Sequence, residues 1–234
     1  MTRGLAENIR KAQALIMAGE ITVAGQAITK PGRLVDEHAS LEIAAKLPYV
    51  SRGGIKLAHG IDEFKLNVDS SVSMDVGAST GGFTDCLLQR GVNRVYAVDV
   101  GYGQLDYKLR QDPRVIVMEK VNARYPFSLP EKIDMATIDL SFISVTKVIP
   151  NLIEHLKKSS YIIILLKPQF EARKEEVGKG GIIRDPQTHA RVLGRFIAWI
   201  IDNHLRLRGL IESPILGAEG NKEFLILLTP GQKQ

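Results

Sequence analysis

Residues 72–85 read VSMDVGASTGGFTD, and this stretch decides the fold. Its first five residues form a short, mainly apolar segment that is typical of a buried strand. Residues 82–89 have the pattern of a helix, so the glycine-rich segment between them is a strand-to-helix turn. Such a turn after the first strand of an open α/β sheet lets a cofactor approach the backbone closely. We therefore expect an α/β fold with its ligand site at this turn.

Short apolar segments alternate with amphipathic segments on both sides of this stretch, which indicates a mostly parallel sheet. We expect a Rossmann-like sheet of seven strands whose last strand is antiparallel. The predicted strands cover residues 72–76, 94–98, 115–118, 133–138, 160–166, 207–215 and 224–228. The predicted helices cover residues 54–64, 82–89 and 186–203, the last of them capped by Asp185.

The glycine-rich turn differs from the dinucleotide-binding fingerprint G-x-G-x-x-G at one place. Ser79 stands where the middle glycine gives a pyrophosphate room, which disfavours a nicotinamide cofactor. A nucleoside without phosphates, such as S-adenosylmethionine, tolerates that side chain better, and Asp99 after the second strand suits its two ribose hydroxyls. A purely structural turn is the alternative. The residues predicted to bind the cofactor are Asp75, Gly77, Ala78, Ser79, Gly81, Gly82, Phe83, Asp99, Asn122 and Asp139.

Four ionisable residues are expected at the carboxyl edge of the sheet, where open α/β sheets bind their ligands. Asp139 and Lys167 follow the fourth and fifth predicted strands. Glu223 precedes the last strand, and an antiparallel direction brings it to the same edge. Lys56 lies in the first turn of a helix that runs opposite to the first strand. Unrelated surface charges are the alternative, but charges at three strand ends beside a cofactor turn favour a site.

These four residues resemble the Lys-Asp-Lys-Glu tetrad of the FtsJ-like 2′-O-ribose methyltransferases. Their surroundings are similar to the TlyA, or hemolysin A, family of rRNA methyltransferases, in the motifs SRGG at 51–54, DVGASTGGFT at 75–84, DLSF at 139–142, LKPQFE at 166–171 and EGNKE at 219–223. The resemblance covers residues 49–230. It implies a class I methyltransferase fold, S-adenosylmethionine as cofactor, and 2′-O-ribose methylation of ribosomal RNA or a ribosomal subunit. The catalytic residues would be Lys56, Asp139, Lys167 and Glu223.

The first 46 residues form a small separate unit. We expect a helix from Ile9, capped by Asn8 and ended by Gly19, and then strands at 21–23, 27–29 and 41–43, with a turn at 24–26. This unit resembles the S4 RNA-binding domain that TlyA proteins carry. The family usually has a further short helix before this point, so the domain is expected to be truncated. The domain prediction is therefore an S4-like domain at 1–46, a linker at 47–53 and the methyltransferase domain at 54–234.

The chain is basic, since 31 Lys and Arg residues against 26 Asp and Glu residues give a net charge of +5. A basic balance favours polyanionic partners. Cations gather before residue 34 and in the long loop 168–184, whose length is typical of functional loops. Phe142 and Phe170 flank the expected site and are candidates to stack a flipped base, although such residues more often belong to the core. The residues predicted to bind RNA are Arg10, Lys11, Arg173, Lys174, Lys179 and Arg184.

Methyl transfer from a sulfonium to a ribose 2′-oxygen needs in-line positioning and removal of the hydroxyl proton. Lys167 is the candidate for the central role. As a neutral amine it would take the proton, and as an ammonium it would stabilise the forming alkoxide, and the sequence leaves both open. Asp139 is expected to orient Lys167, while Lys56 and Glu223 hold the ribose.

Other activities fit the sequence less well. A base-directed aminomethyltransferase is expected to carry Asn or Asp before Pro-Pro-aromatic, whereas residues 139–142 read DLSF. Five histidines without metal-ligand spacing and a single cysteine, Cys86, predict no metal site. A non-catalytic RNA-binding or membrane-active, hemolysin-like protein is the remaining alternative. Because we find no signal-peptide core and the longest aliphatic run is 162–166, we expect a soluble, cytoplasmic protein.

Overall fold

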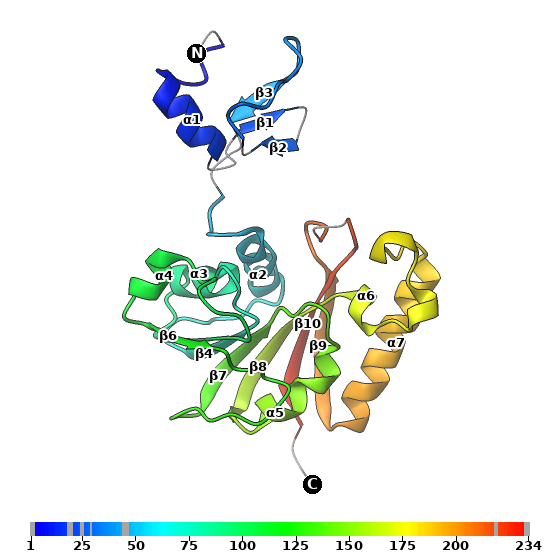
Figure 1. Cartoon of the computed structure of the whole chain (residues 1–234). Helices are drawn as coiled ribbons and strands as arrows, with labels where there is room; N and C mark the ends of the chain where they lie inside the picture. Colours follow the sequence, from blue (N-terminus) through cyan, green and yellow to red (C-terminus); the bar gives the residue numbers. More distant parts are fainter. Residues whose placement is uncertain are drawn as a thin grey trace. The chain divides into compact units, whose positions relative to one another are not determined.

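The structure is a computed structural model that describes residues 3–17, 21–23, 26–28, 30–43, 47–217 and 220–231. The chain divides into two compact units, Met1–Pro48 and Tyr49–Gln234 (Figure 1). The first unit contains a helix, α1 (Ile9–Met17), and a three-stranded antiparallel sheet of order β2-β1-β3. Its strands are β1 (Ile21–Val23), β2 (Gln26–Ile28) and β3 (Leu41–Ile43).

The N-terminal elements agree closely with the sequence prediction. The backbone N–H of Ala12 donates to the carbonyl of Asn8 at 3.0 Å, which is the first intrahelical bond expected above a cap at Asn8. The strands at 21–23 and 41–43 lie where predicted, and the middle strand begins one residue earlier, at Gln26. Gly19 and residues 24, 25 and 29, on which the predicted helix end and turn depend, lie outside the described residues.

The second unit is built on a seven-stranded sheet of order β6-β5-β4-β7-β8-β10-β9. Its strands are β4 (Val72–Val76), β5 (Arg94–Asp99), β6 (Val115–Glu119), β7 (Ile133–Ile138), β8 (Leu156–Leu166), β9 (Leu205–Glu212) and β10 (Phe224–Pro230). The first five are parallel, and β10 is antiparallel to both of its neighbours, as predicted. The chain runs outward from β4 through β5 to β6 and then crosses back to β7, so the strand order reverses between β4 and β7. Ligands of open α/β sheets bind at such a reversal, beyond the carboxyl ends of the strands.

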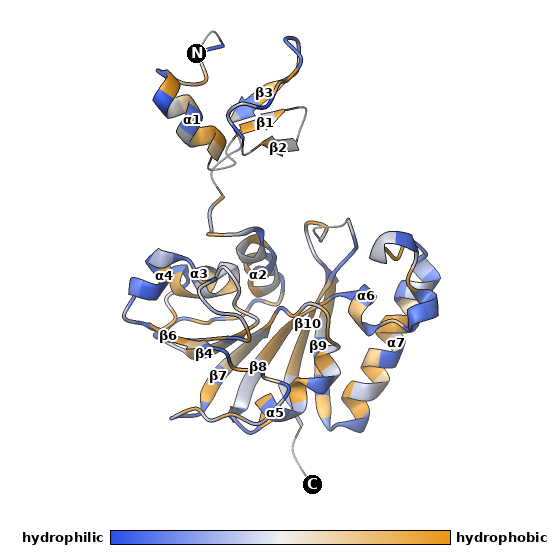
Figure 2. Ribbon diagram, viewed as in Figure 1, coloured by the Kyte–Doolittle hydropathy of each residue, from blue (hydrophilic) through white to orange (hydrophobic). Residues whose placement is uncertain are grey.

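Two apolar cores cover the faces of this sheet, and β8 contributes to both. Ile162, Ile164 and Leu166 face one core, and Ile163 and Leu165 face the other, because successive side chains of a strand point to opposite faces. The first core lies under α5 (Ile149–Ile153) and α7 (Pro186–Asp202), and the second under α2 (Arg52–Glu63), α3 (Gly82–Gln89) and α4 (Tyr107–Gln111). Figure 2 shows the resulting hydrophobic strands.

The predicted and observed elements differ mainly in four respects. β8 begins at Leu156 rather than residue 160, because exposed polar residues at 157–159 hide its start from an apolar pattern. β9 ends at Glu212 rather than residue 215, since Pro214 has no N–H for the sheet. Arg52 and Gly53, predicted as linker, form the first turn of α2. α4, α5, α6 (Pro168–Glu171) and three single-turn 3₁₀ helices (Val145–Lys147, Lys174–Glu176 and Lys179–Gly181) are too short to show a period.

Helix α2 meets Tyr49 at a glycine. A Cβ on Gly54 would lie 2.3 Å from Cγ and 2.4 Å from Cβ of Tyr49, so the position has no room for a side chain. Gly194 in α7 is the opposite case, because a Cβ there would meet no atom within 4 Å.

The same substitution at these two glycines should change stability in opposite directions. Gly54→Ala should lower the free energy of unfolding by about 1–3 kcal/mol, because the added methyl group collides with the ring. Gly194→Ala should raise it by about 0.5–1 kcal/mol, because alanine loses less backbone entropy in a helix. Denaturant unfolding of the two variants and the wild type measures both values. Equal effects would show that the Tyr49 contact does not limit the Gly54 position.

Candidate active site

The glycine-rich turn after β4 is pressed against the end of β7. Gly77 has φ +85°, and a Cβ there would lie 2.2 Å from the carbonyl oxygen of Asp139. Only glycine fits such a close approach of two backbones. The Asp139 N–H donates to the Val76 carbonyl at 3.0 Å, and the Gly77 N–H donates to the Val98 carbonyl at 2.8 Å. The turn thereby joins the ends of β4, β5 and β7.

Asp99, at the end of β5, holds the turn from the other side. Its Oδ2 accepts the N–H of Ser79 at 2.8 Å, and its Oδ1 accepts the N–H of Gly101 at 2.6 Å. Ser79 has φ +48°, which is the left-handed conformation. A glycine, such as the middle glycine of the dinucleotide fingerprint, adopts this conformation more easily than a serine. Each carboxylate oxygen retains acceptor capacity, because an ionised carboxylate offers about four lone-pair sites.

A cavity of about 480 Å³ opens between these loops. Its volume lies in the range of small-molecule sites. Asn122 lines it and also caps a turn, since its Oδ1 accepts the N–H of Arg124 at 3.1 Å. The lining residues that matter here are Gly77, Ser79, Asp99, Gln104, Asn122, Asp139, Ser141 and Phe142.

Asp75, predicted to bind the cofactor, lies beneath the turn and does not line either cavity of this edge. It is fully buried, and its carboxylate accepts the hydroxyls of Thr84 at 2.7 Å and Thr137 at 3.0 Å. Burial raises the pKa of Asp75 to about 6, because no cation offsets the loss of hydration. The carboxyl group therefore joins β4, α3 and β7 under the site.

The four predicted catalytic residues form two ion pairs. Lys167 Nζ lies 2.7 Å from Asp139 Oδ1, and it donates to Ser141 Oγ at 3.0 Å. Asp139 Oδ1 is buried and has no hydrogen-bond partner among the described residues, so its contact with Lys167 counts as an ion pair alone. Lys56 pairs with Glu223, and both side chains are at least nine-tenths buried.

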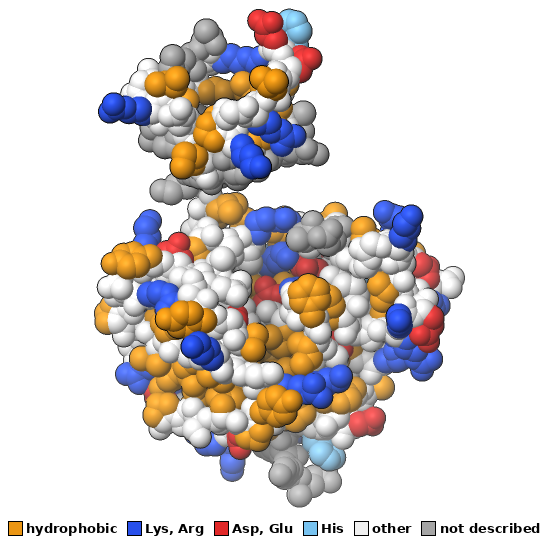
Figure 3. Space-filling view, viewed as in Figure 1, with side chains coloured by type: hydrophobic (Ala, Val, Ile, Leu, Met, Phe, Trp, Pro, Cys, Tyr) orange, Lys and Arg blue, Asp and Glu red, His pale blue; other side chains and the backbone are white. Residues whose placement is uncertain are grey.

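A second, smaller cavity of about 120 Å³ brings the two pairs to one place. Lys56 and Asp139 both line it, together with Ala78, Gly82 and Phe83. Gly77, Ser79 and Asp139 line both cavities, so Asp139 stands between the two. Figure 3 shows acidic and basic side chains together in a hollow of the second unit. Gly81 lines neither cavity; it precedes α3 with φ +97°.

Phe142, after β7, is 91% exposed and has φ +65°. The left-handed conformation costs a residue of this size about 1–2 kcal/mol. Its ring lies 5.2 Å from that of Phe170 in α6, at an interplanar angle of 50°. An exposed, strained aromatic residue beside a cavity is a functional candidate.

Glu171 joins the same two loops below the rings. Its carboxylate accepts the Ser144 hydroxyl at 2.5 Å and the Val145 N–H at 2.8 Å. Burial raises the pKa of Glu171. The carboxylate thus fixes α6, which follows Lys167, to the segment that follows Asp139.

The basic loop after α6 is also anchored. Asn221 accepts the Ile183 N–H at 2.9 Å and donates to the Gly181 carbonyl at 3.0 Å. Arg195 donates twice to Glu176 and lowers the pKa of Glu176 to about 2. The predicted RNA-binding residues Arg173, Lys174, Lys179 and Arg184 are exposed and form no ion pair among the described residues. In the first unit Arg10 is exposed on α1, and the side chain of Lys11 lies outside the description.

The sequence prediction missed four of these contributors: Gln104, Ser141, Glu171 and Asn221. Three of them, Ser141, Glu171 and Asn221, belong to the motifs quoted above. Each of these motifs contains a tetrad residue, so closeness to the tetrad in the sequence was the signal that could have found them. Gln104 accepts the Ser79 hydroxyl at 3.4 Å and has no signal in the sequence.

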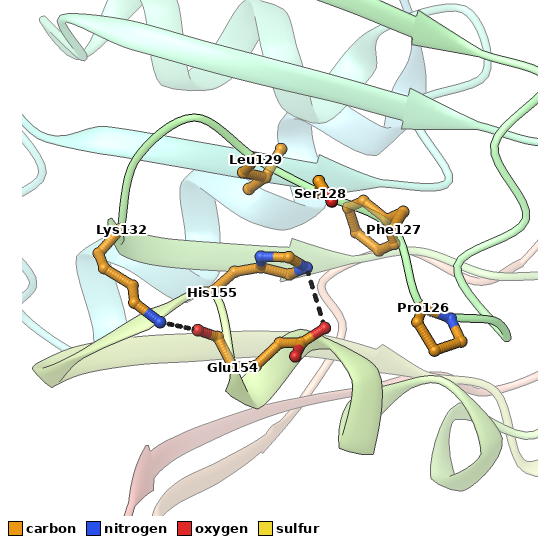
Figure 4. A pocket seen from close by; sticks show the side chains of 7 residues that line it. All are labelled: Pro126, Phe127, Ser128, Leu129, Lys132, Glu154 and His155. Carbon is orange, nitrogen blue, oxygen red and sulfur yellow. Dashed lines mark hydrogen bonds and ion pairs between the residues drawn. The ribbon is translucent and has the colours of Figure 1, made fainter.

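A further cavity, of about 450 Å³, lies at the starts of β7 and β8, on the opposite edge of the sheet (Figure 4). The His155 ring lies 4.7 Å from the Phe127 ring at an interplanar angle of 38°, and burial lowers the pKa of His155. Lys132 donates to the Glu154 carbonyl. Within the described part of the chain, we find neither a cluster of three or more potential metal ligands nor a helix long and apolar enough to span a membrane.

Comparisons with known proteins agree with this geometry. Residues 49–229 match the FtsJ-like methyltransferase family, and residues 2–41 match the S4 domain. YqxC of Bacillus subtilis, described as a candidate rRNA methyltransferase, is 48% identical over 99% of this chain and 84% of its own length. The 16S/23S rRNA (cytidine-2′-O)-methyltransferase TlyA of Mycobacterium tuberculosis is 40% identical over 97% of this chain and 86% of its own. A solved structure from Streptococcus thermophilus, described as a candidate hemolysin, has a TM-score of 0.80 and 42% identity, covering 99% of this chain and 86% of that one.

The raised pKa of Asp75 predicts a pH-dependent stability. Between about pH 4 and 6 the folded protein binds a proton at Asp75 that the unfolded chain has lost, so the free energy of unfolding falls as the pH rises through this window. Asp75→Asn removes this titration. As the pH rises from 4 to 7, the free energy of unfolding of the variant should therefore increase by about 2–3 kcal/mol relative to that of the wild type. Urea unfolding at pH 4 and at pH 7 measures this difference. Asp202→Asn, at the exposed end of α7, is the control, and a constant difference between Asp75→Asn and wild type would contradict the prediction.

Proposed function

We propose that this chain, which belongs to the FtsJ-like methyltransferase family, methylates ribosomal RNA on a ribose 2′-oxygen with S-adenosylmethionine as the methyl donor. The observation that carries the proposal is the Lys167–Asp139 ion pair, whose carboxylate lines the cavity formed by the glycine-rich turn. The S4 match and the activity named for TlyA of Mycobacterium tuberculosis support ribosomal RNA as the substrate.

The residues around the larger cavity fit S-adenosylmethionine. Gly77 lines the cavity with bare backbone, since its lack of a Cβ lets the turn pack on the Asp139 carbonyl, and Asp99 offers carboxylate oxygens to the ribose hydroxyls. Asn122 lines the cavity where an adenine edge would be bound, and Asp139 Oδ1, which forms an ion pair with Lys167, has no hydrogen-bond partner among the described residues. When bound, this cofactor supplies a methyl group already activated by its positive sulfur.

Lys167 acts on the ribose hydroxyl in this proposal. For the ribose oxygen to accept the methyl group that the cofactor would supply, the hydroxyl proton must leave that oxygen. Asp139 and Ser141 hold Lys167 from one side, so its nitrogen has a fixed position beside Asp139. Beside a carboxylate, the ammonium form stabilises negative charge on the ribose oxygen, and the proton then passes to water. A neutral Lys167 would accept the proton itself, and a pH–rate profile distinguishes the two routes.

Lys56 and Glu223 position the ribose in the smaller cavity. Their buried ion pair removes both charges from water, and this desolvation costs free energy that their attraction only partly offsets. Lys56 lines the cavity, where its remaining hydrogen-bond donors face the entering sugar. Phe142, exposed and backed by Phe170, is placed to stack the base of the flipped target nucleotide.

Rival functions lack equivalent support. Ser79 in the left-handed conformation occupies the place that a dinucleotide pyrophosphate needs, which disfavours a nicotinamide enzyme. A base-directed methyltransferase would place a Pro-Pro-aromatic segment after β7, where this chain has Leu140, Ser141 and Phe142. The hemolysin names of some relatives make membrane activity an outcome to test with erythrocytes, but no surface of the described residues favours it over RNA. An RNA substrate and a single cysteine, Cys86, suit the reducing cytoplasm.

Substitution of Lys167 and Asp99 should separate catalysis from cofactor binding. Lys167→Ala should reduce methyl transfer to ribosomal RNA roughly 10²-fold or more and leave the dissociation constant for S-adenosylmethionine unchanged. Asp99→Ala should weaken cofactor binding first, because the ribose and the turn lose their acceptor. Labelled methyl transfer to ribosomal subunits and calorimetry measure the two effects, with exposed Lys147→Ala as the control. Turnover by Lys167→Ala within a few fold of wild type would remove Lys167 from the mechanism.

The exposed cations after α6 should contribute salt-dependent RNA affinity. Arg173→Ala with Lys179→Ala should reduce the slope of log affinity against log salt by about two phosphate contacts. Arg206→Ala with Arg208→Ala, on exposed residues at the start of β9 and the opposite edge of the sheet, is a control of similar charge change. Fluorescence anisotropy with ribosomal RNA fragments over a salt series gives the slopes. Parallel lines for all three proteins would mean that this loop does not bind RNA.

A further inference from the structure

Exposed aromatic rings gather at one edge of the sheet. Tyr102 is 72% exposed, Tyr107 is 74% exposed and Tyr125 is 59% exposed. Phe142, also exposed, lines the larger cavity at this edge. Among the described residues, Tyr161 is the other exposed aromatic residue, at 39%, and it lies in β8 away from this edge. Aromatic side chains are usually buried for most of their area, so such a concentration indicates a binding surface.

The three tyrosines stand on loops that the cofactor turn and its neighbours hold in place. Tyr102 follows β5, where the N–H of Lys120 donates to the Gly101 carbonyl at 3.1 Å. Tyr125 follows β6, and its N–H donates to the Asn122 carbonyl at 3.0 Å. Tyr107 begins α4, and the preceding Asp106 N–H donates to the Thr80 carbonyl at 3.1 Å.

None of the three tyrosines lines the cofactor cavity, although residues beside each loop do. Val100, Gln104 and Arg124 contribute to its wall, and the tyrosine rings lie outside that wall. The rings are therefore available to a partner other than the cofactor.

Basic side chains accompany the rings. Lys120 Nζ lies 4.6 Å above the centre of the Tyr102 ring, and Arg124 Cζ lies 5.9 Å from that of Tyr125. Lys108, beside Tyr107, is exposed. In the part of the chain that the structure describes, these three cations form no ion pair, whereas Glu119 is paired with Arg110 and Asp106 caps α4. Figure 3 shows hydrophobic and basic side chains side by side where Figure 1 draws α4 and β6.

We propose that Tyr102, Tyr107 and Tyr125, here called the tyrosine rim, bind an unpaired stretch of RNA next to the target nucleotide. This inference rests on the proposed function, which supplies an RNA at the neighbouring cavity. Unpaired bases expose faces that stack on aromatic rings, while the bases of an A-form duplex are stacked on one another. Lys108, Lys120 and Arg124 would contact the phosphates of the same stretch. The rim therefore selects unpaired RNA rather than a duplex.

The test uses the full chain and a fluorescein-labelled single-stranded RNA of about 12 nucleotides, alone or annealed to its complement. Tyr102→Ala with Tyr125→Ala should weaken binding of the single strand about fivefold or more for each ring and change duplex binding little. Tyr102→Phe with Tyr125→Phe keeps both rings and should retain the affinity. Tyr161→Ala is the control for loss of an exposed tyrosine elsewhere. The dissociation constant for S-adenosylmethionine should be the same in all variants.

Several results would overturn the tyrosine rim. Equal affinities of the alanine and phenylalanine variants, equal losses for single strand and duplex, or weaker cofactor binding by the alanine variant would each do so. Unchanged RNA affinity with weaker binding to whole ribosomal subunits would assign the surface to a protein partner instead.

Labelled methyl transfer by the wild type separates the tyrosine rim from the proposed function. If the wild type methylates ribosomal RNA and the alanine variant matches it in RNA affinity, the rim fails alone. If the wild type binds the single strand through the rim but transfers no methyl group, the proposed function fails alone.

Discussion

The close contact between the backbones of Gly77 and Asp139 is the constraint on which the rest of the site depends. Without a Cβ at Gly77, the turn after β4 packs directly on the end of β7, and the Asp139 N–H completes the link at the Val76 carbonyl. That contact gives the larger cavity one wall and fixes the backbone of the residue that pairs with Lys167. The proposed cofactor cavity and the Lys167–Asp139 pair are therefore positioned by the same backbone contact, at the reversal of strand order.

Several energetically unfavourable features gather at the same edge of the sheet. Asp75 is buried without a cation, Lys56 and Glu223 are removed from water as a pair, and Phe142 has a left-handed backbone. A buried ion pair is weak evidence for stability, and strained backbones persist only where the surroundings determine them. The two apolar cores on the faces of the sheet offset these costs. Local conflicts with folding rules that lie together are expected at functional sites.

The sequence predicted the fold well where its signals were periodic. β4, β7 and α3 have their predicted bounds, because an apolar strand and a glycine turn leave a clear local pattern. Placement of Asp139 and Lys167 at one edge followed from the parallel direction of their strands. The pattern could not show which lysine pairs with which acid, since pairing depends on loop geometry. Ser141 beside Lys167 and the cross-link through Glu171 were missed for the same reason, and Asp75 was assigned to the cofactor because burial beneath the turn leaves no trace in spacing.

The unequal sizes of the two cavities bear on what the site accepts. The larger, of about 480 Å³, suits a whole cofactor, whereas the smaller, of about 120 Å³, has room for on the order of four water molecules. In the proposed reaction a sugar edge enters the smaller cavity, while the base and the neighbouring nucleotides stay outside it. Selection of the RNA would then depend on exposed groups outside the smaller cavity, such as Phe142 and the tyrosine rim, and not on the groups proposed to carry out the transfer. A ribose is common to all nucleotides, so chemistry confined to the sugar requires that specificity come from the surface.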